Sequence, residues 1–254
     1  MEVSTLQYAS WWLANLLVGT TIFRVAKNGL VRQYLLFFFY LACNLLQSIG
    51  LFFVIQKKPE MYAQLYWFSE LFEVVLGFLI IWQMYEKIFR HYPGLAKATR
   101  WMMAAGLLIF ASGALLASLR SQPLPGYAVL VRDMRAAHIG FLVILIGLLT
   151  YYLIPVGRNT RGLVVGYSIL VSATVINFAL GLVLGQPFQP WVDYLQPLAY
   201  AAAVAVWCWA FWSYRPDPVP AGERLLEVHY QRAVRATAQL VSDLRAYVVG
   251  QART

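Results

Sequence analysis

The amino-acid sequence predicts an all-α membrane protein, a polytopic bundle of seven transmembrane helices with one further amphipathic helix at its C-terminus. Of its 254 residues, 61% are hydrophobic and 12% are charged, whereas soluble domains are about half apolar and about a quarter charged. The apolar residues form seven long blocks, and each block has roughly the 20 residues that a helix needs to cross about 30 Å of hydrocarbon. Six of the blocks contain no Asp, Glu, Lys or Arg.

The expected spans follow these blocks in chain order. The chain begins with Glu2 close to its start and without a basic leader, so we expect the first block to be a retained helix and not a cleaved signal peptide. Short connections predict that consecutive helices are antiparallel neighbours, which makes residues 1–214 one seven-helix domain. The seven spans are expected at 6–23, 33–56, 64–85, 101–119, 136–156, 162–185 and 194–214.

The sequence leaves two alternatives for one connection and two roles for a pair of motifs in the sixth span. The connection from Arg120 to Arg135 opens with a Pro/Gly turn and then has apolar residues among charged ones. It fits either an extension of the fifth helix or a separate interfacial helix. The sixth span carries two GxxxG motifs, at 162–166 and 181–185, which allow close helix approach. We expect them to pack within the chain first and to form a dimer face only second.

The basic residues predict the orientation, because lysine and arginine are retained preferentially on the cytoplasmic side. Of the 20 lysines and arginines, 15 lie in the connections and tail on one side and five on the other. This places the N-terminus outside and the C-terminus in the cytoplasm, with the plasma (inner) membrane as the expected location. The net charge of +9 does not indicate nucleic-acid binding, because the basic residues lie between apolar blocks. The expected partner of these blocks is the lipid bilayer.

The segment after the last span is expected to form a linker and a contact helix. Residues 215–222 contain three prolines and predict a Pro-rich linker. Residues 223–254 follow as a cytoplasmic amphipathic helix, with apolar residues spaced alternately three and four apart. Its stripe over 223–250 could dock on the chain's own inner loops, lie on the membrane or bind a cytoplasmic protein partner.

Two acidic residues inside the third span are the main indication of function. Glu70 and Glu73 are three residues apart and therefore share one helix face, which we expect to point into the bundle. A charge at that depth costs about 3 kcal/mol on insertion scales, so each carboxylate needs a donor, water or a proton. We expect Arg135 to reach down to Glu70, and Glu73, which lies deeper, to carry a proton. The same outer half of the bundle contains Asn15, Asn44, Gln47, His138 and Asn177.

These eight residues form the candidate ligand-binding set, and three interpretations of them stay open. The polar network could only fix helix register. It could be an outward-facing site for a small ligand or ion. It could also carry out catalysis or proton transfer through its paired carboxylates. The three histidines are scattered, so we expect no histidine metal site. We assign no catalytic residue, and no cofactor is indicated.

Seven spans, an outer N-terminus and a cytoplasmic amphipathic helix resemble the general layout of rhodopsin-like and G-protein-coupled receptors. The seventh span contains no lysine for a retinal Schiff base, and the third ends Gln83-Met84-Tyr85 without the receptors' acidic-Arg-Tyr triplet. The resemblance therefore extends to layout alone. Our leading expectation is a non-enzymatic receptor or sensor with an outward-facing polar pocket. The alternatives are a membrane enzyme or proton-coupled carrier using Glu70 and Glu73, and a non-catalytic subunit of a larger membrane complex.

Overall fold

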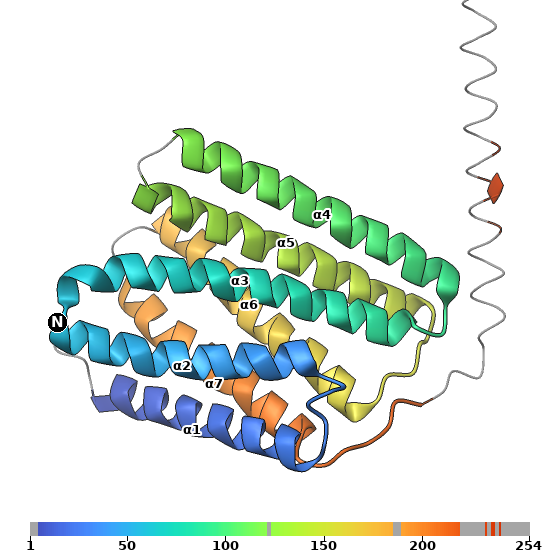
Figure 1. Ribbon diagram of the computed structural model, residues 1–254, viewed down its shortest axis with the longest axis horizontal. Coiled ribbons are helices and arrows are strands. Elements are labelled where there is room, and N and C mark those ends of the chain that lie inside the picture. Colours follow the sequence, from blue (N-terminus) through green and yellow to red (C-terminus); the bar gives the residue numbers. More distant parts are fainter. Residues whose placement is uncertain are drawn as a thin grey trace, which may run out of the picture.

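The computed structural model describes residues 5–120, 123–184 and 189–218, and four isolated positions at 232, 235, 236 and 239. Over these residues it is all-helical and contains seven long helices (Figure 1). Their bounds are α1 Thr5–Lys27, α2 Leu35–Lys57, α3 Pro59–Phe89, α4 Pro93–Arg120, α5 Pro123–Tyr151, α6 Arg158–Leu184 and α7 Gln189–Ala210. The expected amphipathic helix at 223–254 lies outside the described residues apart from those four positions.

Prolines and turns account for several helix boundaries. Pro59, Pro93 and Pro123 each occupy the first position of a helix, where the missing N–H is not needed and the fixed φ angle favours the helical conformation. After α1, Gly29 has a φ of 66°, which only glycine adopts without strain, and the chain turns there toward α2. Because α5 runs without a break from Pro123 to Tyr151, the segment before the fifth expected span is a helix extension and not a separate interfacial helix.

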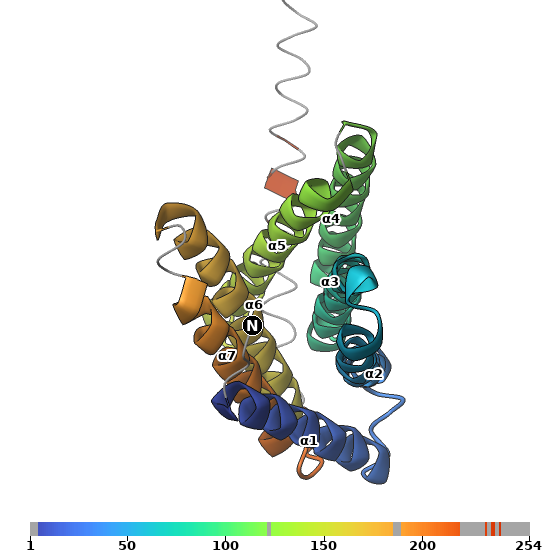
Figure 2. The same cartoon turned by 90° about the vertical axis from the view of Figure 1, so that its left-hand side faces the viewer.

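The helices form a ring of six with one helix outside it. Each of α1, α2, α3, α5, α6 and α7 packs against the next, and α7 packs back on α1, whereas α4 packs outside the ring on α3 and α5. Figure 2 shows this arrangement nearly along the helix axes, with α4 at the edge of the molecule. The expectation that consecutive helices are neighbours is confirmed. We call the end of the bundle where α1 begins the N-terminal end, and the end where α1 and α7 finish the C-terminal end.

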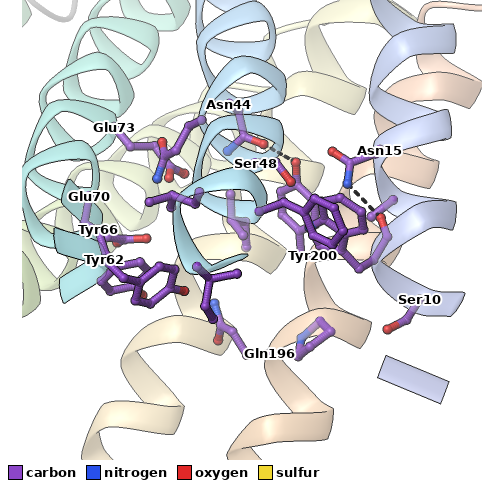
Figure 3. A pocket seen from close by; sticks show the side chains of 18 of the residues that line it. Ser10, Asn15, Asn44, Ser48, Tyr62, Tyr66, Glu70, Glu73, Gln196 and Tyr200 are labelled. Atoms are coloured by element: carbon purple, nitrogen blue, oxygen red, sulfur yellow. Dashed lines mark hydrogen bonds between the residues drawn. The ribbon is translucent and has the colours of Figure 1, made fainter. Parts of the chain in front are cut away.

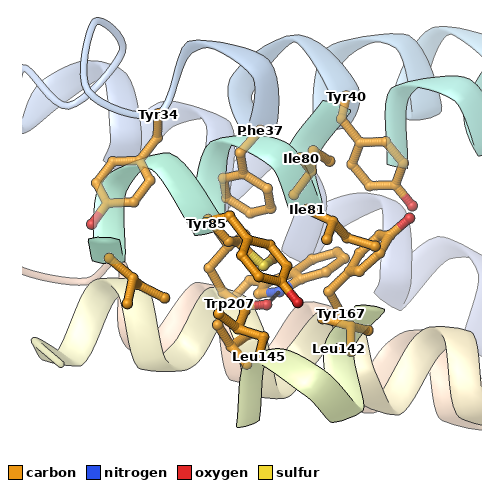
Figure 4. Packing of buried hydrophobic residues seen from close by; sticks show 14 of the residues in the cluster. Tyr34, Phe37, Tyr40, Ile80, Ile81, Tyr85, Leu142, Leu145, Tyr167 and Trp207 are labelled. Atoms are coloured by element: carbon orange, nitrogen blue, oxygen red, sulfur yellow. Dashed lines mark hydrogen bonds between the residues drawn. The ribbon is translucent and has the colours of Figure 1, made fainter. Parts of the chain in front are cut away.

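The packed core lies in the C-terminal half of the ring. On α2 the fully buried side chains are confined to the start of the helix, and on α3 they begin only at Val74. Phe37 of α2 stacks on Phe211 at 5.1 Å between ring centroids and meets the edge of Trp207 of α7 at 5.2 Å. Figure 4 shows this cluster, with Tyr40 and Tyr167 at its boundary. The N-terminal half of the ring is therefore not filled by this packed cluster of aromatic side chains.

Small residues let α6 and α7 approach closely. A Cβ atom on Gly162 would collide with Ala210, and one on Gly166 would come within 2.6 Å of Cδ1 of the buried Trp207. Such a Cβ on Gly181 meets no atom of the described residues within 4 Å, and Gly185 lies outside the described residues. The first GxxxG motif thus packs within the chain, as expected.

The outside of the bundle is strongly apolar. Large hydrophobic side chains are exposed on every helix, for example Leu46, Phe68, Leu108 and Val183 with 70%, 73%, 72% and 81% of their surface accessible. Monomers in water rarely expose so much contiguous apolar surface. Four segments are long and apolar enough to cross a membrane: Leu35–Lys57, Pro59–Phe89, Leu130–Tyr151 and Arg158–Gly181. These features are compatible with a membrane protein, while the full set of seven spans and its direction stay predictions.

Candidate functional site

A cavity of about 710 Å³ occupies the N-terminal half of the bundle. All six helices of the ring contribute to its wall, and Figure 3 shows side chains from α1, α2, α3 and α7 converging on it. Six members of the candidate set line this cavity: Asn15, Asn44, Gln47, Glu70, Glu73 and Arg135. The cavity therefore lies in the half of the ring that the packed aromatic core does not fill.

An ion pair joins α3 to α5 at the cavity wall. Nη2 of Arg135 donates a hydrogen bond to Oε2 of Glu70 at 2.6 Å, and the side chains of these residues are 8% and 16% exposed. Charge-assisted pairs of this length are the stronger hydrogen bonds of proteins. The pairing expected from the sequence is therefore present. It depends on the extension of α5, because Arg135 lies before the apolar part of that helix.

Glu73 lies one turn deeper and is held differently. The hydroxyl of Tyr40 donates a hydrogen bond to Oε1 of Glu73 at 2.8 Å. Among the described residues, no lysine, arginine or histidine lies within ion-pair distance of Glu73. Its carboxyl group therefore has a hydrogen-bond donor without a neutralising cation, on a helix that packs between α2 and α5.

Amide and hydroxyl groups complete the polar wall. Tyr200 of α7 donates a short hydrogen bond to Oδ1 of Asn44, and Asn15 donates to the carbonyl of Trp11 at 3.0 Å (Figure 3). Gln196 lines the cavity, and its Oε1 accepts a hydrogen bond at 2.7 Å from Asn177. Asn177 therefore does not face the cavity but orients a residue that does.

His138 lies behind the cavity wall. It is 1% exposed, and its Nδ1 is 3.3 Å from the hydroxyl of Tyr167 on α6. Gly77 leaves room for this pair, because a Cβ there would overlap the Tyr167 hydroxyl and come within 3.1 Å of the His138 ring. The contact ties α3, α5 and α6 together beneath the carboxylates, so His138 supports the site without lining it.

Aromatic side chains that the candidate set did not include also face the cavity. Tyr62 and Tyr66 of α3 stack with their ring centroids 6.0 Å apart, and Trp11 of α1 stacks on Phe52 of α2 at 5.2 Å. All four residues line the cavity. Tyr66 could have been identified from its spacing, because it lies four residues before Glu70 and so shares its helix face.

The donor set fits an organic ligand better than a metal ion. Over the part of the chain that the structure describes, no three His, Cys, Asp or Glu side chains gather at one point. Oxygen-binding cations such as Ca²⁺ take six or more oxygen ligands, and Glu70 is already engaged by Arg135. The wall instead combines a few polar groups with aromatic faces, which is typical of small-molecule pockets.

No protein-family model, curated protein or solved structure matches the chain.

A second polar cluster closes the C-terminal end. Asp217, in the first part of the expected linker, accepts hydrogen bonds from the backbone N–H of Gly157 at 3.0 Å and from Thr160 at 3.2 Å. Its Oδ2 also lies 3.6 Å from Nζ of Lys87 on α3. Asn28 of α1 donates to the carbonyl of Phe211 at 3.1 Å. The chain that follows α7 is thus fastened to α1, α3 and α6.

Proposed function

We propose that this protein is a non-enzymatic membrane receptor or sensor with seven transmembrane helices. Its pocket at the N-terminal end opens to the outside and binds a small ligand. One observation carries the proposal: a cavity of about 710 Å³ has in its wall a carboxyl group, Glu73, that no cation neutralises among the described residues. Intramembrane ionisable groups are rare because they are costly, and those that are kept usually serve a function.

The charge distribution and the surface support this topology. The 15 basic residues on the side of the C-terminal end favour the cytoplasm for that end. The apolar exterior of the helices suits contact with lipid. In this arrangement the pocket faces the external medium, and the segment expected at 223–250 would be available to a cytoplasmic partner or to the inner membrane surface.

The contacts of the bundle provide a route for a signal. A ligand in the pocket would touch α1, α2, α3 and α7 at once and so change how these helices pack. The chain after α7 is bound to α3 through Lys87 and to α6 through Gly157 and Thr160. A shift of α7 relative to these helices would therefore be passed to the linker and the contact helix.

A proton-coupled carrier is the second candidate, because Glu73 is a protonatable group within a cavity. A carrier needs access to its site from both ends in turn. In this structure Phe37, Trp207 and Phe211 are fully buried below the site, so a carrier would have to separate these aromatic side chains to open its other end. The third candidate is a subunit of a larger complex. It is supported by Gly181 of the second GxxxG motif, which packs against no described residue and could contact another protein.

The ligand can be sought in the purified protein. We expect mass spectrometry of the full chain, extracted from membranes in mild detergent, to detect a small molecule that is lost from Ser48→Phe. Ser48 lines the cavity, and a phenyl ring there occupies the space of a ligand. Ser112→Phe is the matched control, since it makes the same change on the exposed outer face of α4. Identical sets of bound molecules in all three proteins, each folded as judged by its unfolding temperature, would contradict the proposal.

A further inference from the structure

We propose that the pocket takes a monovalent organic cation, an amine with an apolar body, whose ammonium group lies against the carboxylate of Glu73. This inference rests on the proposed function and specifies its ligand. It follows from the charges, the aromatic faces and the size of the cavity.

The acidic and basic side chains that line the cavity leave one carboxyl group without a cation. Glu70, Glu73 and Arg135 are the acidic and basic side chains of its wall. Arg135 and Glu70 neutralise each other at 2.6 Å. Glu73 has only the neutral hydroxyl of Tyr40, at 2.8 Å. A cationic ligand that takes the place of the proton expected on Glu73, which is released to water, completes the balance, and a buried carboxylate gains most from a partner that both neutralises it and donates hydrogen bonds.

The same wall disfavours an anionic ligand. Among the described residues of the wall, the one guanidinium group, that of Arg135, is already bound to Glu70. Nε of Arg135 is buried and has no hydrogen-bond partner among the described atoms. An anion that reached the other N–H groups of Arg135 would lie beside Glu70 and near Glu73, so two like charges would oppose it.

The aromatic residues distinguish an amine from a bare metal ion. The stacked pair Tyr62–Tyr66 lies on the same helix as Glu73, and the pair Trp11–Phe52 joins α1 to α2 at the wall. Ring faces attract ammonium groups and pack against hydrocarbon, whereas a small alkali ion needs several oxygen ligands to replace its water. The volume of about 710 Å³ falls within the range of pockets for small organic ligands, about 300–1,000 Å³.

The test compares three probes of nearly the same shape and different charge: phenethylammonium, phenethyl alcohol and hydrocinnamate. Binding to the purified full chain in detergent is measured by calorimetry. We expect phenethylammonium to bind tighter than phenethyl alcohol by about tenfold or more, because a charge-assisted hydrogen bond replaces a neutral one. We expect hydrocinnamate to bind more weakly still.

Variants connect the preference to named residues. Glu73→Gln should remove the preference for the cation, and Tyr66→Leu should weaken phenethylammonium several-fold while the preference remains. Glu60→Gln is the matched control for the first change, because it removes an exposed carboxylate from the first turn of the same helix. It should leave all three affinities unaltered.

The outcomes separate this inference from the proposed function. If phenethyl alcohol or hydrocinnamate binds as tightly as the cation, and Ser48→Phe abolishes that binding, the pocket is a ligand site and the amine class is wrong. If none of the three probes binds, and purified wild type and Ser48→Phe also carry the same small molecules, both proposals are overturned. Retention of the cation preference in Glu73→Gln would contradict the role given to that residue.

Discussion

Replacing Arg135 with Met is expected to lower the free energy of unfolding by about 3–5 kcal/mol, because it leaves a buried carboxylate without its cation. The guanidinium is the charged partner of Glu70 at 2.6 Å, and both side chains are largely shielded. Glu73, one turn away on the same helix, would then lie beside Glu70 without the guanidinium of Arg135. Thermal unfolding of the purified protein in detergent measures the loss.

Arg132→Met provides the control on the same helix. Arg132 forms an ion pair with Asp133 at 2.8 Å, but these side chains are 36% and 54% exposed, so its loss should cost about 0–1 kcal/mol. The double variant Arg135→Met with Glu70→Met should recover much of the stability, because no unpaired charge remains. Equal losses of unfolding free energy in the Arg132 and Arg135 variants would show that the Arg135–Glu70 ion pair stabilises the bundle no more than an exposed ion pair does.

Replacing Glu73 with Met is expected to act in the opposite direction, raising the stability of the ligand-free protein by about 1–3 kcal/mol. The side chains are similar in length, and the change removes a carboxyl group that is costly to keep among apolar helices. The hydroxyl of Tyr40 loses its acceptor, which offsets about 1 kcal/mol of the gain. The measurement is again thermal unfolding, with bound molecules first removed by washing.

The double variant Tyr40→Phe with Glu73→Met separates the two contributions. It should be more stable than Glu73→Met alone, since no unpaired hydroxyl remains. A residue that destabilises the fold and is nevertheless present serves a ligand, because binding sites commonly lose stability to keep function. If Glu73→Met instead lowers stability as strongly as Arg135→Met, Glu73 belongs to a network that fixes helix register, and the first of the three sequence-based interpretations holds.

The helices and their order were predictable because long apolar blocks admit few alternatives. The ends of the helices were less predictable. The third helix begins at Pro59 and ends at Phe89, well outside the expected span at 64–85, since hydropathy marks the part that suits hydrocarbon while the helix continues through polar residues on both sides. The continuation of α5 back to Pro123 also determines where Arg135 lies. The sequence had left two alternatives for this segment, an extension of the fifth helix or a separate interfacial helix.

The acidic part of the site followed from helical spacing, whereas its partners depend on which helices meet. Glu70 and Glu73 share a face whatever the tertiary structure. Tyr40 and Tyr200 reach the site only because α2 lies beside α3 and the ring closes through α7. His138 and Asn177 lie behind the wall. The sequence could not show this, because a span that is apolar all round does not reveal which of its faces turns inward.

Thiol labelling tests most directly the central claim that the polar pocket opens to the external face of the membrane. In a chain whose two cysteines, Cys43 and Cys208, are replaced by Ala, Ser48→Cys places a thiol on the cavity wall. Gln33→Cys places one at the exposed C-terminal end of the bundle. In spheroplasts, a membrane-impermeant methanethiosulfonate reagent with a trimethylammonium group should modify Ser48→Cys, and should modify Gln33→Cys only after the membrane is permeabilised. Modification of Gln33→Cys alone in sealed spheroplasts would reverse the orientation, and protection of Ser48→Cys even after permeabilisation would show that no open pocket exists.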